Sequence, residues 1–296
     1  MLTRPHIPPR LLVLLFACCL PPAHSSAADQ PPRQPFFAFC MDTHDSQKRS
    51  LAEQAALLKN LGYDGCGHLW LDNLPERLKT LDAANLTLFQ IYLRLDLSPT
   101  AKEPYDPRLK QILPHLKNRP TMLAILISNQ KPSDPIYDPR AVQLLNEIAD
   151  LAQPQNTRIA LYPHRGDWLE RPSDALRLVK QINRPTVGIM FNLCHYLATD
   201  TQQNLKPTLQ SVLPHLFAIS ISGSDTASEI QSGKGNWIQP LGQGSFDMPA
   251  FLRLLDDLHY SAPIGLQCYG LPGDARDHLA QSMKAWRALS AQLQIN

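Results

Sequence analysis

Apolar residues along the chain fall into two alternating patterns, short continuous runs and longer segments in which they recur every three or four positions. The continuous runs predict strands at residues 36–41, 63–69, 86–95, 122–127, 159–162, 187–191, 217–221 and 264–268. The periodic segments predict helices at 46–61, 74–84, 109–116, 140–152, 173–182, 201–216 and 246–258, and Asp274 is expected to cap an eighth. This alternation predicts an α/β chain folded as a closed (β/α)8 TIM barrel of one domain, with an open doubly wound sheet as the alternative. No glycine fingerprint follows the first strand, so no nucleotide cofactor is expected.

Polar residues that follow the predicted strands are expected to surround one mouth, because the carboxyl ends of parallel strands meet at one end of a barrel. His164 and His195, after the fifth and sixth strands, are the first candidates for acid–base catalysis, with Asp42 or Asp225 orienting or replacing one of them. The candidates for substrate binding are His68, Trp70, Tyr92, Tyr162, Trp168, Asn192, Trp237, Gln267 and Tyr269. Aromatic rings stack on sugars and amides bind hydroxyl groups, so this set favours a small-molecule carbohydrate as the ligand.

The first 28 residues have the anatomy of a secretory signal. Arg4 and Arg10 precede an apolar run at 11–20, and a stretch of small residues ends at Ala28. We therefore expect a signal peptide at 1–28, a Pro-rich lead at 29–35 and the barrel domain at 36–296, in a protein exported to the periplasm or the medium. The apolar run is too short to span a bilayer, and lipid attachment at Cys18 is the less favoured alternative.

Removal of residues 1–28 leaves 26 Lys and Arg against 26 Asp and Glu. A chain without a basic surplus is not expected to bind nucleic acid. Four cysteines lie beyond the signal, Cys40, Cys66, Cys194 and Cys268, all within or just after predicted strands. They are expected to be small buried side chains, and a disulfide from Cys40 to Cys66 or to Cys268 is the alternative in an oxidising compartment.

Five segments carry a resemblance to a known family. They read Gly-Tyr-Asp-Gly at 62–65, Tyr-Pro-His at 162–164, Phe-Asn-Leu-Cys-His at 191–195, Pro-Leu-Gly-Gln-Gly-Ser-Phe-Asp at 240–247 and Pro-Ile-Gly-Leu-Gln at 263–267. Together they resemble the xylose-isomerase-like TIM barrels, the sugar phosphate isomerases and epimerases that share a fold with endonuclease IV. The resemblance covers nearly the whole chain after the signal.

The same resemblance implies one divalent metal. The family usually holds it through a Glu after the fifth strand, an Asp with a nearby His after the sixth, a His after the seventh and a Glu after the eighth. This chain has Tyr162 or His164, Asn192, Ser222 and Gln267 at those places and retains His195. The loss of anionic ligands disfavours Mg²⁺ and Mn²⁺, whereas His164 and His195 are candidates for a rebuilt zinc-type site. The sequence leaves open whether a metal is bound.

The resemblance and the strand-end residues together predict an exported enzyme that isomerises or epimerises a non-phosphorylated sugar or keto-sugar, by proton transfer next to a carbonyl. Two alternatives stay open: a lyase or hydrolase of modified glycosides, and a non-catalytic carbohydrate-binding barrel that has lost the family's metal site. A nuclease is disfavoured by the balanced charge. The identity of the sugar and the oligomeric state are left open.

Overall fold

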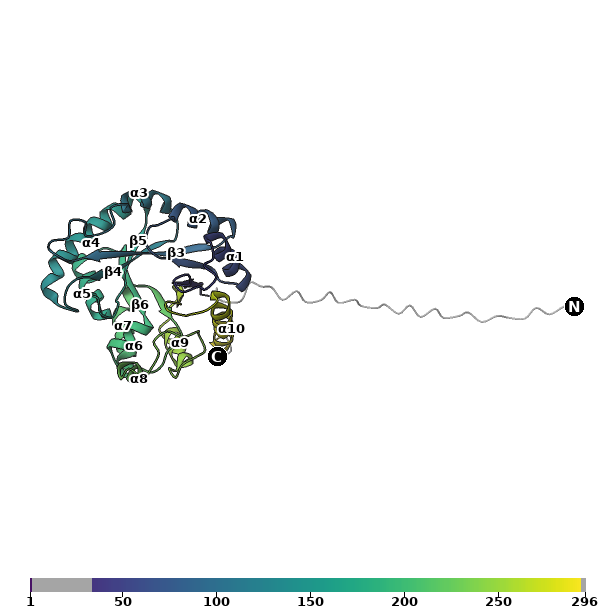
Figure 1. Cartoon of the computed structure of the whole chain (residues 1–296). Helices are drawn as coiled ribbons and strands as arrows, with labels where there is room; N and C mark the ends of the chain where they lie inside the picture. The colour runs from purple at the N-terminus through teal and green to yellow at the C-terminus, as the bar shows by residue number, and fades with distance from the viewer. Residues whose placement is uncertain (2–33, 294–296) are drawn as a thin grey trace. The chain divides into compact units, whose positions relative to one another are not determined.

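Eight parallel strands close into a barrel in which each strand pairs with the next along the chain and β1 pairs with β8 (Figure 1). The computed structural model describes Met1 and residues 34–293. The strands are β1 (Phe36–Phe39), β2 (Gly65–His68), β3 (Thr87–Asp96), β4 (Met122–Ser128), β5 (Arg158–Leu161), β6 (Val187–Asn192), β7 (Leu216–Ile221) and β8 (Ile264–Gln267). All eight predicted strands are present, and the closed barrel is confirmed over the open sheet.

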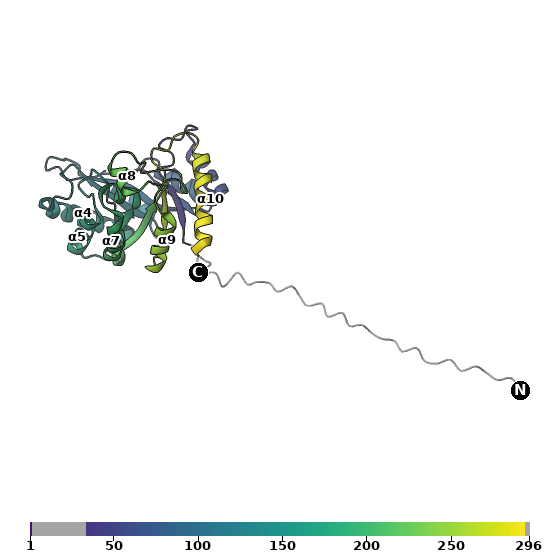
Figure 2. The ribbon, with the colours of Figure 1, turned by 90° about the horizontal axis from the view of Figure 1, so that it is seen from below.

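Helices surround the barrel, and a side view shows α7, α9 and α10 along its outer wall (Figures 1 and 2). The α-helices of the described residues are α1 (Leu51–Leu61), α2 (Leu74–Ala83), α3 (Leu109–Ile112), α4 (Asp138–Ala152), α5 (Pro172–Ile182), α6 (Leu193–Thr199), α7 (Leu205–Val212), α8 (Ala227–Gln231), α9 (Met248–Asp257) and α10 (Ala275–Leu293). Short 3₁₀ helices lie at η1 (Leu113–Leu116), η2 (Pro135–Tyr137), η3 (Gln153–Gln155), η4 (Gln202–Asn204) and η5 (Leu213–His215).

The helices differ from the sequence prediction in several regions, and the predicted helix at 109–116 divides into α3 and η1. The helix predicted at 201–216 is shorter, because α7 begins only at Leu205 and Pro214 lies in η5. Pro207 then lies in the first turn of α7, where a missing N–H costs no intrahelical hydrogen bond. Two short helices, α6 and α8, were not predicted. The start of α8 carries a recognisable signal, a capping box formed by Thr226 and Glu229.

Phenylalanine side chains fill the barrel interior. Phe37 and Phe39 from β1 have ring centroids 6.2 Å apart, and Phe37 stacks on Phe89 of β3 at 4.6 Å. Gly265 of β8 makes room for them, because a Cβ there would lie 2.7 Å from the Phe37 ring. Gly67 of β2 does the same, with a Cβ that would lie 2.8 Å from Cβ of Phe39. The interior of the barrel is therefore packed with side chains and is not an open channel.

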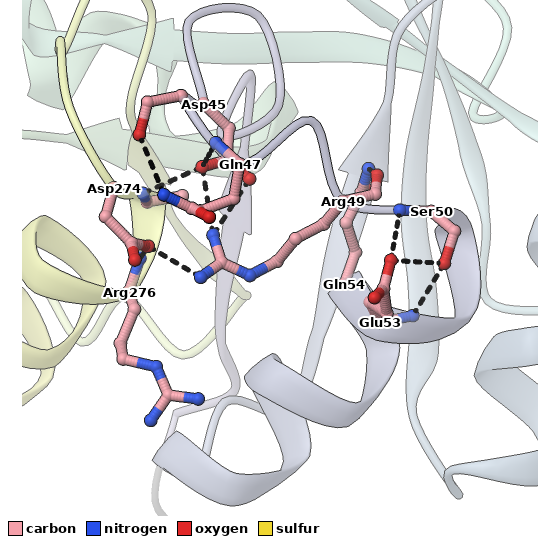
Figure 3. Close-up of polar contacts among 10 residues, drawn as sticks. Asp45, Gln47, Arg49, Ser50, Glu53, Gln54, Asp274 and Arg276 are labelled. Carbon is pink, nitrogen blue, oxygen red and sulfur yellow. Dashed lines mark hydrogen bonds and ion pairs between the residues drawn. The ribbon is translucent and has the colours of Figure 1, made fainter.

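A polar clamp joins the loops that follow β1 and β8, the two strands that close the barrel (Figure 3). The Asp45 carboxylate accepts hydrogen bonds from Arg49 at 2.9 Å and from the backbone N–H of Ala275 at 3.1 Å, and its side chain is 2% exposed. Arg49 also binds Asp274 at 2.6 Å. Ser50 then caps α1, so this helix begins at Leu51 rather than at the predicted residue 46. The clamp fixes the mouth loops on both sides of the closing strand pair.

The predicted signal peptide and nearly all of the Pro-rich lead lie outside the described residues. Within the part of the chain that the structure describes, no helix combines the length and apolar character needed to cross a bilayer. Cys40, Cys66, Cys194 and Cys268 are buried and free. The prediction of small buried side chains is confirmed for all four, and the structure contains neither alternative disulfide.

Candidate active site at the barrel mouth

Tyr162, directly after β5, is the centre of a buried hydrogen-bonded group in the floor of the mouth. The side-chain amides of Asn192 and Gln267 both donate to its phenol oxygen, Gln267 at 3.3 Å. The Tyr92 ring packs edge-on against it at 5.6 Å, and the Cys194 thiol donates to the Asn192 carbonyl oxygen at 3.0 Å. Among the described residues no acceptor takes the phenol's own proton. That proton is therefore free to be donated to a ligand in the mouth.

The protonation state of this phenol is set mainly by its environment. Burial raises the pKa of Tyr162 well above its ordinary value, and the hydrogen bonds from Asn192 and Gln267 offset only part of this effect. The phenol thus stays protonated at neutral pH. It can donate a hydrogen bond to a carbonyl or enediolate oxygen.

The two histidines predicted as catalytic meet beside this phenol. The ring centroids of His164 and His195 are 3.9 Å apart, with the rings tilted by 46°. Tyr162 lies 6.2 Å from the first ring and 5.9 Å from the second, again between centroids. The structure therefore brings together residues from the ends of β5 and β6 that the sequence selected separately.

His164 is held in one tautomer. Its Nδ1 lies 3.0 Å from the backbone carbonyl of Arg165, which can only accept, so Nδ1 carries the proton in the neutral ring. Nε2 is then left with a lone pair, and no described residue binds it. The Asp167 carboxylate lies 3.7 Å from Nδ1 and is in turn bound by Arg94 at 3.1 Å. Burial lowers the pKa of His164, opposed by the nearby Asp167 charge, so the neutral ring is a base available at neutral pH.

His195 lies deeper, on α6. It is 5% exposed, and its Nδ1 is buried without a hydrogen-bond partner. Burial holds the pKa of His195 well below its ordinary value, with further lowering from the nearby His164 and Arg165 charges. The Trp237 ring packs edge-on at 6.2 Å, and the Arg165 guanidinium stacks on that tryptophan at 4.3 Å. His195 is thus a neutral imidazole that Trp237 and Arg165, from the loops after β7 and β5, cover.

Three predicted site residues have structural contacts of their own. His68 is 7% exposed and lies between the Asp72 carbonyl, 2.7 Å from its Nε2, and Arg77, which donates to its Nδ1 at 3.3 Å. Trp168 is fully buried, and its indole N–H donates to the Asp134 carbonyl at 2.8 Å. Asp225 accepts hydrogen bonds from the backbone N–H groups of residues 236 and 245. Its carboxylate thereby organises the β7 loop.

The remaining predicted residues lie around the rim. Asp42 is exposed after β1, and no hydrogen bond or ion pair joins it to His164 or His195 in the described chain. Tyr269 after β8 is 55% exposed and packs edge-on against His44 at 5.3 Å. Trp70 after β2 is 40% exposed. These side chains are open to a ligand that reaches beyond the floor of the mouth.

Asp167 and Arg94 contact the candidate site, and the sequence prediction placed neither among its catalytic or substrate-binding residues. A carboxylate three residues after His164 in one loop is the signal that identifies Asp167 as its partner. Arg94 carries no such local signal, because its partner is far away in the sequence. β3 and the β5 loop become neighbours because β3 and β5 both pair with β4.

The fold and this histidine-bearing mouth define a (β/α)8 barrel with a polar candidate site at the carboxyl ends of its strands. The sequence model of the xylose isomerase-like TIM barrel family matches residues 119–289, and the chain belongs to this family. It is a family of sugar isomerase-, epimerase- and dehydratase-like barrels.

Two curated relatives are similar to part of the chain. An inosose isomerase of Bacillus licheniformis is 24% identical over 146 residues, which cover 49% of this chain and 51% of the relative. An inosose dehydratase of Serratia proteamaculans is 22% identical over 126 residues, which cover 39% and 42%. The chain thus spans about half, or less, of the length of these relatives. Among solved structures, an IOLI protein with a bound zinc atom has a TM-score of 0.68 at 18% identity, covering 87% of this chain and 98% of that one, which shows the shared fold.

The metal site implied by the family does not fit the residues present. The positions after β5, β6 and β8 hold Tyr162, Asn192 and Gln267, whose polar groups are bonded to one another and carry no negative charge. Ser222 after β7 is engaged with the Trp237 carbonyl at 3.3 Å. Among the described residues no group of three or more His, Cys, Asp or Glu side chains is arranged to hold a metal ion. Hard divalent cations need anionic oxygen ligands to offset dehydration, and this donor set lacks them.

Proposed function

We propose that this protein is a sugar isomerase or epimerase that transfers a proton next to a carbonyl through its own side chains, without the family's metal. The observation that carries the proposal is the pairing of a base with an acid: Nε2 of His164 has a free lone pair beside Tyr162, which has an uncommitted proton. The substrate class is a non-phosphorylated sugar or keto-sugar. The inosose substrates in the relatives' names support a polyhydroxylated ketone.

Each of these side chains has a separate role in the proposed proton transfer. Nε2 of His164 removes the proton from the carbon next to the carbonyl, and the electron pair of that C–H bond forms the C=C bond of an enediolate. The carbonyl oxygen takes up the negative charge and receives the hydrogen bond, then the proton, of the Tyr162 phenol. His164 then delivers its proton to the former carbonyl carbon, while the hydroxyl on the first carbon returns a proton to the Tyr162 oxygen and becomes the new carbonyl, so both side chains regain their starting protonation states. Asn192 and Gln267 position the phenol, because both donate to its oxygen.

Deuterium exchange tests this function even where the product of the reaction is unidentified. The full chain would be incubated in D₂O with inososes and non-phosphorylated ketoses, and incorporation at the carbon next to the carbonyl followed by NMR. We expect exchange with the wild type and a loss of about 10²–10⁴-fold in His164→Ala. The exchange rate of the wild type should stay constant through neutral pH and fall only below about pH 6.5. Burial lowers the pKa of His164, and protonation of its ring removes the base. The exposed His115 supplies the control, and His115→Ala should retain the wild-type rate.

Other outcomes separate the alternative functions. Exchange that survives in folded His164→Ala would refute the assignment of the base. Sugar binding without exchange or any other conversion would indicate a carbohydrate-binding barrel. Release of a free aglycone would indicate a glycoside lyase or hydrolase.

Export is part of the proposal and is supported by the signal-like residues 1–28. Expression of the full chain in a bacterial host with cell fractionation tests it. We expect the protein outside the cytoplasm with an N-terminus at Asp29. Recovery of the uncleaved chain in the cytoplasm would contradict the proposal.

A further inference from the structure

A cavity of about 590 Å³ lies beside the proposed reaction centre, between the loops that follow β2 and β3. Its lining includes Trp70, Tyr92, Arg94, Asp96, Glu103 and Tyr105. The volume is within the range of about 300–1,000 Å³ that is typical of small-molecule sites. Tyr162 and the two mouth histidines are not part of the lining. The cavity therefore offers space for a part of a ligand that does not react.

Two residues connect the cavity with the reaction centre. Tyr92 lines the cavity and also packs edge-on against Tyr162 at 5.6 Å. Arg94 lines it and also binds Asp167, whose carboxylate lies 3.7 Å from His164. The cavity and the reaction centre therefore share Tyr92 and Arg94 as neighbouring side chains.

Trp70 is an unusual residue for the surface of this cavity. Its indole is 40% exposed, and its backbone φ is +63°, a left-handed conformation that bulky residues rarely adopt. The Arg94 guanidinium lies over the ring, 5.8 Å from the centroid. Backbone strain and an exposed aromatic ring at a cavity wall are typical of a ligand platform.

The charge of the lining restricts what the cavity accepts. Arg108 pairs with Asp72 at 2.7 Å and with Asp106 at 2.5 Å, so these three side chains together keep a negative charge. Asp96 and Glu103 add two further carboxylates. Carboxylates accept hydrogen bonds from hydroxyl and ammonium groups and repel anions. The cavity thus favours a neutral or amino-bearing group over an acidic one.

We propose that this cavity is a second sugar subsite, in which Trp70 stacks on the non-reacting ring of a glycosidic substrate while the first ring occupies the mouth at Tyr162 and His164. This inference rests on the proposed function for the placement of the reacting ring. It assigns the substrate class as a glycoside of a neutral or amino sugar, at least two units long.

Binding measurements on the full chain test the subsite. Titration calorimetry would compare cellobiose, maltose, lactose and chitobiose with the methyl glycosides of their component sugars. We expect at least one disaccharide to bind about tenfold more tightly than either component, an advantage of the size that one aromatic stacking contact gives. Trp70→Asn should abolish that advantage and leave the monosaccharide affinity unchanged. Asparagine tolerates positive φ, so this variant preserves the loop.

Two further variants control the result. Trp70→Phe should keep most of the advantage because it retains an aromatic face. Ile136→Ala should change nothing, since Ile136 is an exposed apolar residue outside the cavity. A disaccharide ending in a uronate on the non-reacting side should bind less tightly than its neutral counterpart.

Equal affinity for disaccharides and their components, or equal weakening of both in Trp70→Asn, would overturn the subsite. Deuterium exchange measured in parallel keeps the two proposals separate. Exchange with monosaccharides and no disaccharide advantage would overturn the subsite and leave the proposed function intact. A Trp70-dependent disaccharide advantage without exchange would overturn the proposed function and leave the subsite intact.

Discussion

Substitution of Tyr162 by phenylalanine tests whether the phenol holds the floor of the mouth together. Tyr162→Phe removes one oxygen and leaves the ring, so no cavity of side-chain size forms. The oxygen accepts from the amides of Asn192 and Gln267, which are 3% and 4% exposed. The other end of each amide is also bound, Asn192 by the Cys194 thiol and Gln267 by the Tyr269 N–H. Neither amide is therefore free to turn toward a new partner.

The expected cost follows from those two amides. A buried donor that loses its acceptor costs about 1–3 kcal/mol. The Gln267 bond is long, at 3.3 Å, and so contributes at the lower end of that range. We expect Tyr162→Phe to lower the free energy of unfolding by about 2–4 kcal/mol.

Tyr63→Phe supplies the matched control, because Tyr63 is another buried tyrosine. Its phenol donates one hydrogen bond, of 2.9 Å, to the Leu279 carbonyl in α10, so its loss should cost only about 1 kcal/mol. Urea unfolding followed by circular dichroism measures both variants, with linear extrapolation to water. A Tyr162→Phe protein as stable as Tyr63→Phe, with unchanged urea dependence, would refute the hydrogen-bonded floor.

Three other predictions concern pH, the clamp and metal. Burial holds the pKa of His195 well below its ordinary 6.5, so the unfolded chain takes up a proton near pH 6.5 that the folded chain refuses. Stability should be full above that pH and fall below it, and urea titrations should show a weaker decline in His195→Asn. Asp45→Asn removes the carboxylate that binds Arg49 and should lower the unfolding free energy by about 2–3 kcal/mol, less than for a fully buried pair because Arg49 keeps a second partner. Elemental analysis of the purified wild type should give well under one equivalent of Zn²⁺, Mn²⁺ or Mg²⁺, and EDTA should not abolish deuterium exchange. A full equivalent of bound metal would show that Asn192 and Gln267 do not exclude it.

The positions of the strands could be predicted from the sequence because buried parallel strands are continuous apolar runs. Residues 122–127 and 187–191 show such runs clearly. His164 and His195 could be selected because each follows such a run. The role of a residue within a loop could not be predicted in the same way. Trp168 follows the fifth strand and is nevertheless fully buried, because the loop turns it back toward Asp134.

Residues whose partners lie far away in the sequence were the hardest to assign. Asp225 follows a strand, as a catalytic carboxylate would. However, backbone N–H groups of its own loop donate hydrogen bonds to both of its oxygens. Arg94 and Asp167 have opposite charges but are separated in the sequence by two α-helices and two strands. The pairing of β3 and β5 with β4 brings the two side chains together, so that Arg94 binds the carboxylate beside His164.

The amides at the ends of β6 and β8 account for the chemistry of the whole mouth. Carboxylates at those two positions would add two negative charges in a buried floor, which only a bound cation could balance. Asn192 and Gln267 have nearly the same shape without the charge, and their N–H groups are directed at Tyr162. The phenol, which burial keeps protonated, then supplies a hydrogen-bond donor at the position where the family's metal would act as a Lewis acid. Burial, assisted by the nearby Arg94 and Arg165 charges, keeps His164 and His195 neutral, and the mouth retains both a base and a proton donor for proton transfer at a carbonyl.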